Sequence, residues 1–116
     1  MRSKEDVKIC VLAAAKVMDE KFGKDIKALD IGEVSTLADY FIIATSLNNP
    51  QAQSMTEACV KACRALGFEL LSSEGEGTGW HLMDFGDIII HIFEEELRRF
   101  YDLERIWADA SEVKIA

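Results

Sequence analysis

The chain has 116 residues, 49% of them apolar, which is enough for one domain with one core and too few for two domains with a cleft between them. It carries 21 acidic against 13 basic residues, a formal charge of −8, without a lysine- or arginine-rich run. Direct nucleic-acid binding is not expected, because it relies on Lys and Arg displacing counterions, whereas an acidic surface suits a basic protein.

The sequence also indicates the compartment. Residues 1–10, MRSKEDVKIC, carry charges where a signal peptide would be apolar, and no apolar run approaches the ~20 residues that span a bilayer. The cysteines Cys10, Cys59 and Cys63 form no C-x-x-C pair, and an odd number cannot all pair within one chain. We expect a soluble, cytoplasmic protein, a single domain over residues 1–116, with its cysteines in the core.

The first half of the chain predicts two helices and two strands. Apolar residues recur at helical spacing over residues 4–22, and Gly23 ends that helix. Residues 25–31 alternate like a strand, while the continuous apolar run 39–46 predicts a more central strand. Asn49 as the N-cap and Pro50 in the first turn begin a second helix, which runs up to Gly67.

The second half predicts three strands and a last helix. Strands are expected at 68–72, 80–84 and 87–93, with a glycine-rich loop at 73–79, and the helix begins near Glu94. The order of all these elements predicts an α/β sandwich whose mixed sheet of about five strands is flanked by helices.

The pair Phe85-Gly86 predicts a tight hairpin. A two-residue turn there would place Trp80 opposite His91. One face would carry Trp80, Leu82, Asp84, Asp87, Ile89 and His91, and the other His81, Met83, Ile88, Ile90 and Ile92. The first face is less apolar and is the better candidate for binding, although a longer turn would shift the pairing.

Catalytic, metal and cofactor sites are not predicted. A lone histidine on an apolar strand is usually structural, and no nucleophile motif accompanies His91. Asp84 and Asp87 beside a glycine turn more often shape the turn than bind a metal. The glycine-rich loop lacks the lysine of a phosphate-binding loop, and its glutamates favour contact with a basic partner.

The last helix has an unusual acidic residue. Its i,i+4 pairs, such as Glu94 with Arg98 and Glu95 with Arg99, are typical of a solvated face. Glu104, however, projects into the apolar arc that holds Leu97 and Trp107, where a carboxylate requires an internal or an external partner.

Several segments resemble the Iojap-like family, the ribosomal silencing factors, over residues 25–110. They are STLADYFIIATS, EGEG and WHLMDFGDIIIHIFEEELRRFYDLERIWADA. The family's C-terminal pattern is met in order and spacing by Trp80, Asp84, Gly86, Asp87, His91, Glu94, Glu95, Arg99, Tyr101, Leu103, Glu104 and Trp107.

This resemblance implies a translational repressor without catalytic activity. Family members bind the large ribosomal subunit through its fourteenth ribosomal protein and block joining of the small subunit, and their fold is similar to that of nucleotidyltransferases. The face described above then becomes the expected partner-binding site, extended by the last helix if it borders the hairpin. Its residues are Trp80, Asp84, Asp87, His91, Tyr101 and Glu104.

Two departures and one alternative accompany the resemblance. The turn before the second helix has Ser46, Leu47 and Pro50 where family members often carry a glycine and an arginine or hydroxyl-rich turn. The alternative is a degenerate or active nucleotidyltransferase-like enzyme, but Thr45-Ser46 is not followed by the D-x-D pair of such enzymes. Whether the free protein forms a homodimer is left undecided by the sequence.

Overall fold

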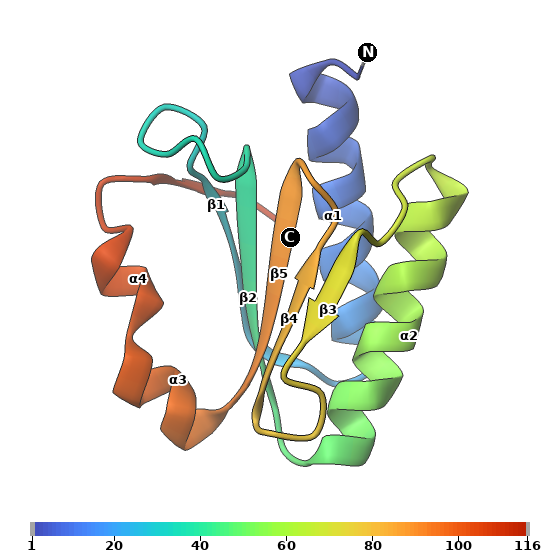
Figure 1. The fold of residues 1–116 in the computed structure, drawn as a ribbon, viewed down its shortest axis with the longest axis vertical. Coiled ribbons are helices and arrows are strands. Elements are labelled where there is room, and N and C mark those ends of the chain that lie inside the picture. The colour runs from blue at the N-terminus through green and yellow to red at the C-terminus, as the bar shows by residue number, and fades with distance from the viewer. Residues whose placement is uncertain (1, 116) are drawn as a thin grey trace.

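The computed structural model describes residues 2–115 and contains one mixed sheet with helices on both faces (Figure 1). Helices α1 (Lys4–Glu20) and α2 (Asn49–Ala65) cover one face, and the short helices α3 (Glu95–Tyr101) and α4 (Leu103–Ile106) lie on the other. The predicted α/β sandwich is therefore confirmed. No helix within residues 2–115 combines the length and the apolar content required to cross a membrane.

The sheet has six strands in the order β3-β4-β5-β2-β1-β6. They are β1 (Lys24–Asp30), β2 (Tyr40–Ser46), β3 (Ser72–Glu74), β4 (Trp80–Asp84), β5 (Ile88–Glu94) and β6 (Ser111–Val113). The sequence predicted about five, because the three-residue β6 is too short to show a strand pattern. It pairs with the edge of β1.

Strand β2 is central, as its continuous apolar run predicted, and all seven of its residues are buried. It pairs in parallel with β5, so that Ser46 and Glu94 lie side by side where the two strands end. Helix α2 follows β2, and α3 follows β5. The ends of the parallel strands therefore bring two helix starts together at one edge of the molecule (Figure 1).

Helices α1 and α2 begin at side-chain caps. Ser3 and Asp6 form a reciprocal capping box at α1. The N-cap of α2 is Asn48 rather than the predicted Asn49, and its side chain accepts a hydrogen bond from the Gln51 amide. The prediction was wrong by one residue, because both asparagines precede Pro50 and suit the position equally well.

The core between these helices and the sheet contains the three cysteines, which are buried and unpaired as predicted. Burial raises the pKa of the Cys59 thiol to about 12. The residues 81, 83, 88, 90 and 92 that the sequence assigned to the more apolar face of the hairpin are all buried. That face assignment is confirmed, since four of the five belong to this core and His81 lies beside α2.

A second, smaller core lies on the opposite face of the sheet. Phe41, Ile43 and Phe93 are among its buried residues, and Leu97 and Trp107 pack against them from the C-terminal region. The continuous last helix predicted from the sequence is instead broken into α3 and α4. The break is Asp102, whose backbone is left-handed with φ of 48°.

Candidate functional site

The β4–β5 hairpin differs in register from the prediction. Trp80 pairs with Phe93 and Leu82 pairs with His91, whereas Trp80 opposite His91 was expected. The Phe85 amide donates to the Ile88 carbonyl, so the two turn residues are Gly86 and Asp87. This register is shifted by two residues, which leaves Trp80, Leu82, Asp84, Ile89 and His91 on one face, as predicted.

Trp80 and His91 are joined by a hydrogen bond despite the shifted register. The Trp80 indole Nε1–H donates to His91 Nδ1 over 3.1 Å. Because Nδ1 accepts, the neutral imidazole carries its proton on Nε2. That nitrogen is buried and has no hydrogen-bond partner among the described residues. His91 is 3% exposed, and burial lowers its pKa from 6.5 to about 4. His91 therefore lies beneath the surface and orients Trp80.

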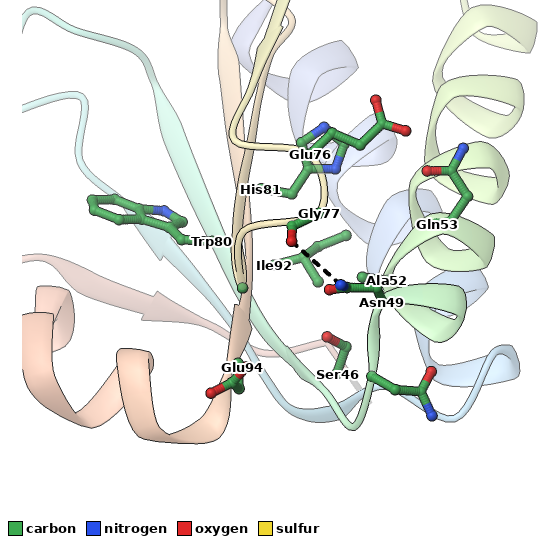
Figure 2. Close-up of a pocket in the computed structure, with 12 residues that line it drawn as sticks. Ser46, Asn49, Ala52, Gln53, Glu76, Gly77, Trp80, His81, Ile92 and Glu94 are labelled. Atoms are coloured by element: carbon green, nitrogen blue, oxygen red, sulfur yellow. Dashed lines mark hydrogen bonds between the residues drawn. The ribbon is translucent and has the colours of Figure 1, made fainter.

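Trp80 belongs to an aromatic cluster that reaches the surface. Its ring stacks on Phe93, with the centroids 4.9 Å apart, and the Tyr101 ring of α3 lies 4.6 Å away on centroid distance. Tyr101 is 43% exposed and Phe100 is 77% exposed. Figure 2 shows the Trp80 side chain on the α3 side of the sheet, with His81 on the α2 side.

A surface groove follows this cluster, with a volume of about 500 Å³. We call it the aromatic groove, and it is lined by Glu74, Gly75, Thr78, Trp80, Leu82, Leu97 and Tyr101. The glycine-rich loop forms one wall and α3 the other. The structure thus brings Trp80 and Tyr101 together, as expected if the last helix borders the hairpin, and adds Glu74 and Leu97, which the sequence did not single out for this site.

Asp84 and Asp87 lie apart from the aromatic groove, at the β4–β5 turn. Asp84 Oδ1 accepts a hydrogen bond from the Gly86 amide over 2.7 Å, which shapes the turn. The Asp87 carbonyl accepts from the amides of Asp39 and Tyr40, and its carboxylate is 3.9 Å from Arg2. Asp84 lies four residue steps along the extended strand from Trp80, roughly 13 Å. The six predicted site residues do not form one compact site.

Glu104, which the sequence placed in the apolar arc of the last helix, has an internal partner. Arg98 Nε donates to Glu104 Oε1 over 2.7 Å, and Arg98 NH1 donates to the Thr45 hydroxyl over 2.7 Å. Lys27 lies 3.9 Å from the other Glu104 oxygen. Among the ion pairs of residues 2–115, Arg98 has Glu104 rather than Glu94 or Asp102 as its partner. This network ties α3 and α4 to β2 across the break at Asp102.

His81 forms a polar network that the sequence did not reveal. Its Nδ1 lies 2.9 Å from the Thr56 hydroxyl, and its Nε2 lies 2.5 Å from the Ser73 hydroxyl. Thr56 donates its proton to the Ala52 carbonyl, so its oxygen accepts from Nδ1–H and Nε2 accepts from Ser73. Burial lowers the pKa of His81. The network fastens the short edge strand β3 and β4 to α2.

Within residues 2–115, no three His, Cys, Asp or Glu side chains come together as metal ligands. The aromatic groove instead offers an aromatic surface with one carboxylate at its edge. Such a surface suits recognition of another macromolecule more directly than bond-making chemistry.

Residues 4–116 match the model of the family described as "Ribosomal silencing factor during starvation". The chain belongs to this family. The match includes α1, so it extends beyond the residues 25–110 that carried the sequence resemblance.

Bacterial relatives of the chain are named ribosomal silencing factor RsfS, and a plant relative is named Iojap. The chain is 35% identical to ribosomal silencing factor RsfS of Bacillus subtilis over 98 residues, 84% of this chain and 83% of that protein. It is 32% identical to the factor of Halalkalibacterium halodurans over 103 residues, 88% of each chain. The chloroplastic protein Iojap of Zea mays is 27% identical over 104 residues, 90% of this chain but 46% of that longer protein.

Solved structures agree with the fold. A crystal structure of a Chromobacterium violaceum protein superposes with a TM-score of 0.81 at 28% identity, covering 93% of this chain and 88% of that one. A Bacillus halodurans crystal structure superposes with a TM-score of 0.78 at 27% identity, covering 92% of this chain and 98% of that one. The likeness to nucleotidyltransferases stays a prediction.

Proposed function

We propose that this ribosomal silencing factor binds the large ribosomal subunit in the cytoplasm and sterically blocks joining of the small subunit. The partner on the subunit is its fourteenth ribosomal protein. The aromatic groove is the observation that carries this proposal, because it presents Trp80 and Tyr101 at the surface of a chain with a formal charge of −8.

Aromatic side chains supply large contact areas at interfaces, and a few of them usually dominate the binding energy. Trp80 is held from below by Phe93 and His91, so little side-chain entropy is lost when a partner covers it. Tyr101 is the more exposed of the two rings and makes the outer contact.

The acidic residues of the proposed site have different roles in binding. Glu74 lines the aromatic groove and faces the bound partner directly. Asp84 and Asp87 at the hairpin turn add to the negative field that attracts a basic protein, chiefly by raising the association rate. Glu104 is engaged by Arg98 and holds α4 in place. His91 positions Trp80 without touching the partner.

We propose that the protein acts without catalysis, because the aromatic groove is a contact surface. The chain would act by occupying a surface that the small subunit requires. This mode of action requires tight, specific contact with one partner, and it requires no cofactor.

Co-sedimentation with separated ribosomal particles tests this function. The protein should pellet with large subunits, in a manner that weakens as salt rises, and should not pellet with small subunits or with assembled ribosomes. Equal binding to both subunits would contradict the proposal, because it would indicate general attraction to the ribosome rather than recognition of one face.

A further inference from the structure

Ser73 is an exposed serine whose hydroxyl is bonded to a buried histidine. It lies in the edge strand β3, in which every residue is exposed, whereas His81 on the neighbouring strand β4 is 5% exposed. The Ser73 hydroxyl oxygen lies 2.5 Å from Nε2 of His81. A base that is shielded from water therefore lies beside a hydroxyl that other molecules can reach.

The hydrogen bonds around His81 determine which of its nitrogens can take a proton. The Thr56 hydroxyl donates to the Ala52 carbonyl over 2.8 Å, so its oxygen accepts from Nδ1–H of His81 over 2.9 Å. Nε2 therefore keeps its lone pair for the Ser73 hydroxyl. Burial lowers the pKa of His81 below 6.5, although the nearby Glu76 carboxylate raises it, so the ring is neutral at pH 7.

The three side chains have the arrangement of an activated nucleophile. A hydroxyl becomes nucleophilic when a neutral imidazole accepts its proton and a third group holds that imidazole in the required tautomer. Ser73, His81 and Thr56 occupy these three positions. They belong to β3, β4 and α2 respectively, so the arrangement exists only in the folded chain.

The neighbouring Ser72 provides an internal comparison. It is exposed like Ser73, but it pairs with Asp84 whereas Ser73 pairs with Met83. Side chains of successive strand residues point to opposite faces, so Ser73 faces α2 with His81 and Ser72 faces the other side of the sheet. A difference in reactivity between the two serines would therefore report on the contact with His81.

The charges next to Ser73 select the kind of reagent. Glu74 and Glu76 follow it in the chain, and both are exposed. Their carboxylates, in a chain with a formal charge of −8, repel anionic donors such as nucleotides and acyl phosphates. A neutral donor, such as an uncharged activated ester, is therefore favoured.

We propose that Ser73 is a modification site that takes an acyl group from a neutral activated ester. Ser73 Oγ forms a bond to the carbonyl carbon of the ester while its proton passes to Nε2 of His81. The C–O bond to the leaving group then breaks, and the leaving oxygen takes the proton from His81. The products are an ester on Ser73 and a free alcohol.

This step modifies the protein itself. Each chain reacts once, so the step involves no turnover and does not rest on the proposed function. Ser73 precedes Glu74, which lines the aromatic groove, so the acyl group would be attached one residue from the proposed binding site.

Acetylation of the purified full chain by 4-nitrophenyl acetate tests this inference without a partner. Mass spectrometry of fragmented peptides follows the acetyl group at Ser73 and at Ser72 in the same molecules. Ser73 should react about a hundredfold faster than Ser72, which is the size of effect expected from a positioned general base. The same measurement in concentrated urea should abolish the difference, because unfolding separates His81 from Ser73.

Three variants complete the test. Ser73→Ala should remove the acetyl ester, which hydroxylamine cleaves, and the matched control Ser72→Ala should retain it. His81→Gln, shown by thermal melting to be folded, should slow acetylation of Ser73 about a hundredfold. If this variant does not fold, the comparison of the two serines in the unmodified chain decides. Equal rates at Ser72 and Ser73 in the folded chain, or an unchanged rate at Ser73 in folded His81→Gln, would overturn the inference.

Discussion

The indole of Trp80 donates its N–H to Nδ1 of His91, over 3.1 Å, from the strand next to the one that carries the histidine. This bond fixes the imidazole as the tautomer protonated on Nε2 and keeps it neutral, because a charged imidazole has no lone pair to accept. It also holds the indole where the aromatic groove requires it. The protonation state of the buried His91 and the shape of the aromatic groove are thereby linked.

Acid should destabilise the fold through His91. Its pKa is about 4 in the folded chain and 6.5 in the unfolded chain, so the unfolded state binds the proton more tightly. The stability it contributes is present above pH 6.5 and is lost as the pH falls towards 4. Between pH 7 and pH 5 we expect a loss of about 2 kcal/mol, measured by chemical denaturation.

His91→Gln is the matched variant for this measurement, since glutamine offers an acceptor to Trp80 and does not titrate. Its unfolding free energy should fall less steeply between pH 7 and pH 5. His81, whose pKa is also lowered, titrates in both proteins and cancels in the comparison. Equal slopes for the two proteins would refute the role assigned to His91.

Tyr101→Ala should weaken binding to large subunits by about 2 kcal/mol while the domain stays folded, because the ring is 43% exposed. Trp80→Ala should weaken binding at least as much, with some loss of stability since its ring stacks on Phe93. Phe22→Ala, an aromatic residue 81% exposed after α1, is the control. Equilibrium binding and thermal melting are both required. Folded Tyr101 and Trp80 variants with unchanged affinity would remove the aromatic groove from the site.

Asp87→Lys distinguishes a long-range charge from a contact residue. Because Asp87 lies at the hairpin turn, we expect association with large subunits to slow by about threefold and the effect to fade at high salt. Dissociation should hardly change. Stopped-flow kinetics measures both rates. If Asp87→Lys raised the dissociation rate as much as Tyr101→Ala does, the interface would extend to the hairpin turn.

Arg98→Met should destabilise the domain by about 1 kcal/mol, because it removes the closest partner of the Glu104 carboxylate and the hydrogen bond to Thr45, while Lys27 stays 3.9 Å from Glu104. The Arg98 side chain is 11% exposed but that of Glu104 is 32% exposed, so solvent partly screens this pair. Adding Glu104→Gln should restore part of the loss, which a double-mutant cycle in denaturant measures. If the double variant were less stable than Arg98→Met, the stranded carboxylate would not be the cause.

The sequence predicted the elements better than their junctions. Alternation along β4 and β5 identified the two faces of the hairpin correctly, but a shift of two residues preserves alternation, so the pattern could not choose between turns at Phe85-Gly86 and Gly86-Asp87. The turn geometry decides, with Gly86 at φ of 91° and its amide bonded to Asp84. The break at Asp102 was missed because an apolar arc continues through it.

Part of the candidate site was likewise predicted from the periodicity of apolar residues. Trp80 lies on the hairpin face that alternation predicted and Tyr101 on the apolar arc of the last helix, and they meet because α3 borders the hairpin. His91 is on that face too, but its burial depends on Phe41 and Phe93 from elsewhere in the chain, which stand near it in three dimensions. The partner of Glu104 also required the fold, since the helix break at Asp102 brings Arg98 to it.

We propose that the protein prevents the subunits from joining by covering the large one. Light scattering of mixed large and small subunits, with the protein added to the large subunits first, tests it most directly. We expect assembly to fall in proportion to the fraction of large subunits that the protein occupies, and the folded Tyr101→Ala variant to be a weaker inhibitor. Full assembly of ribosomes while the protein stays bound to the large subunit would contradict it.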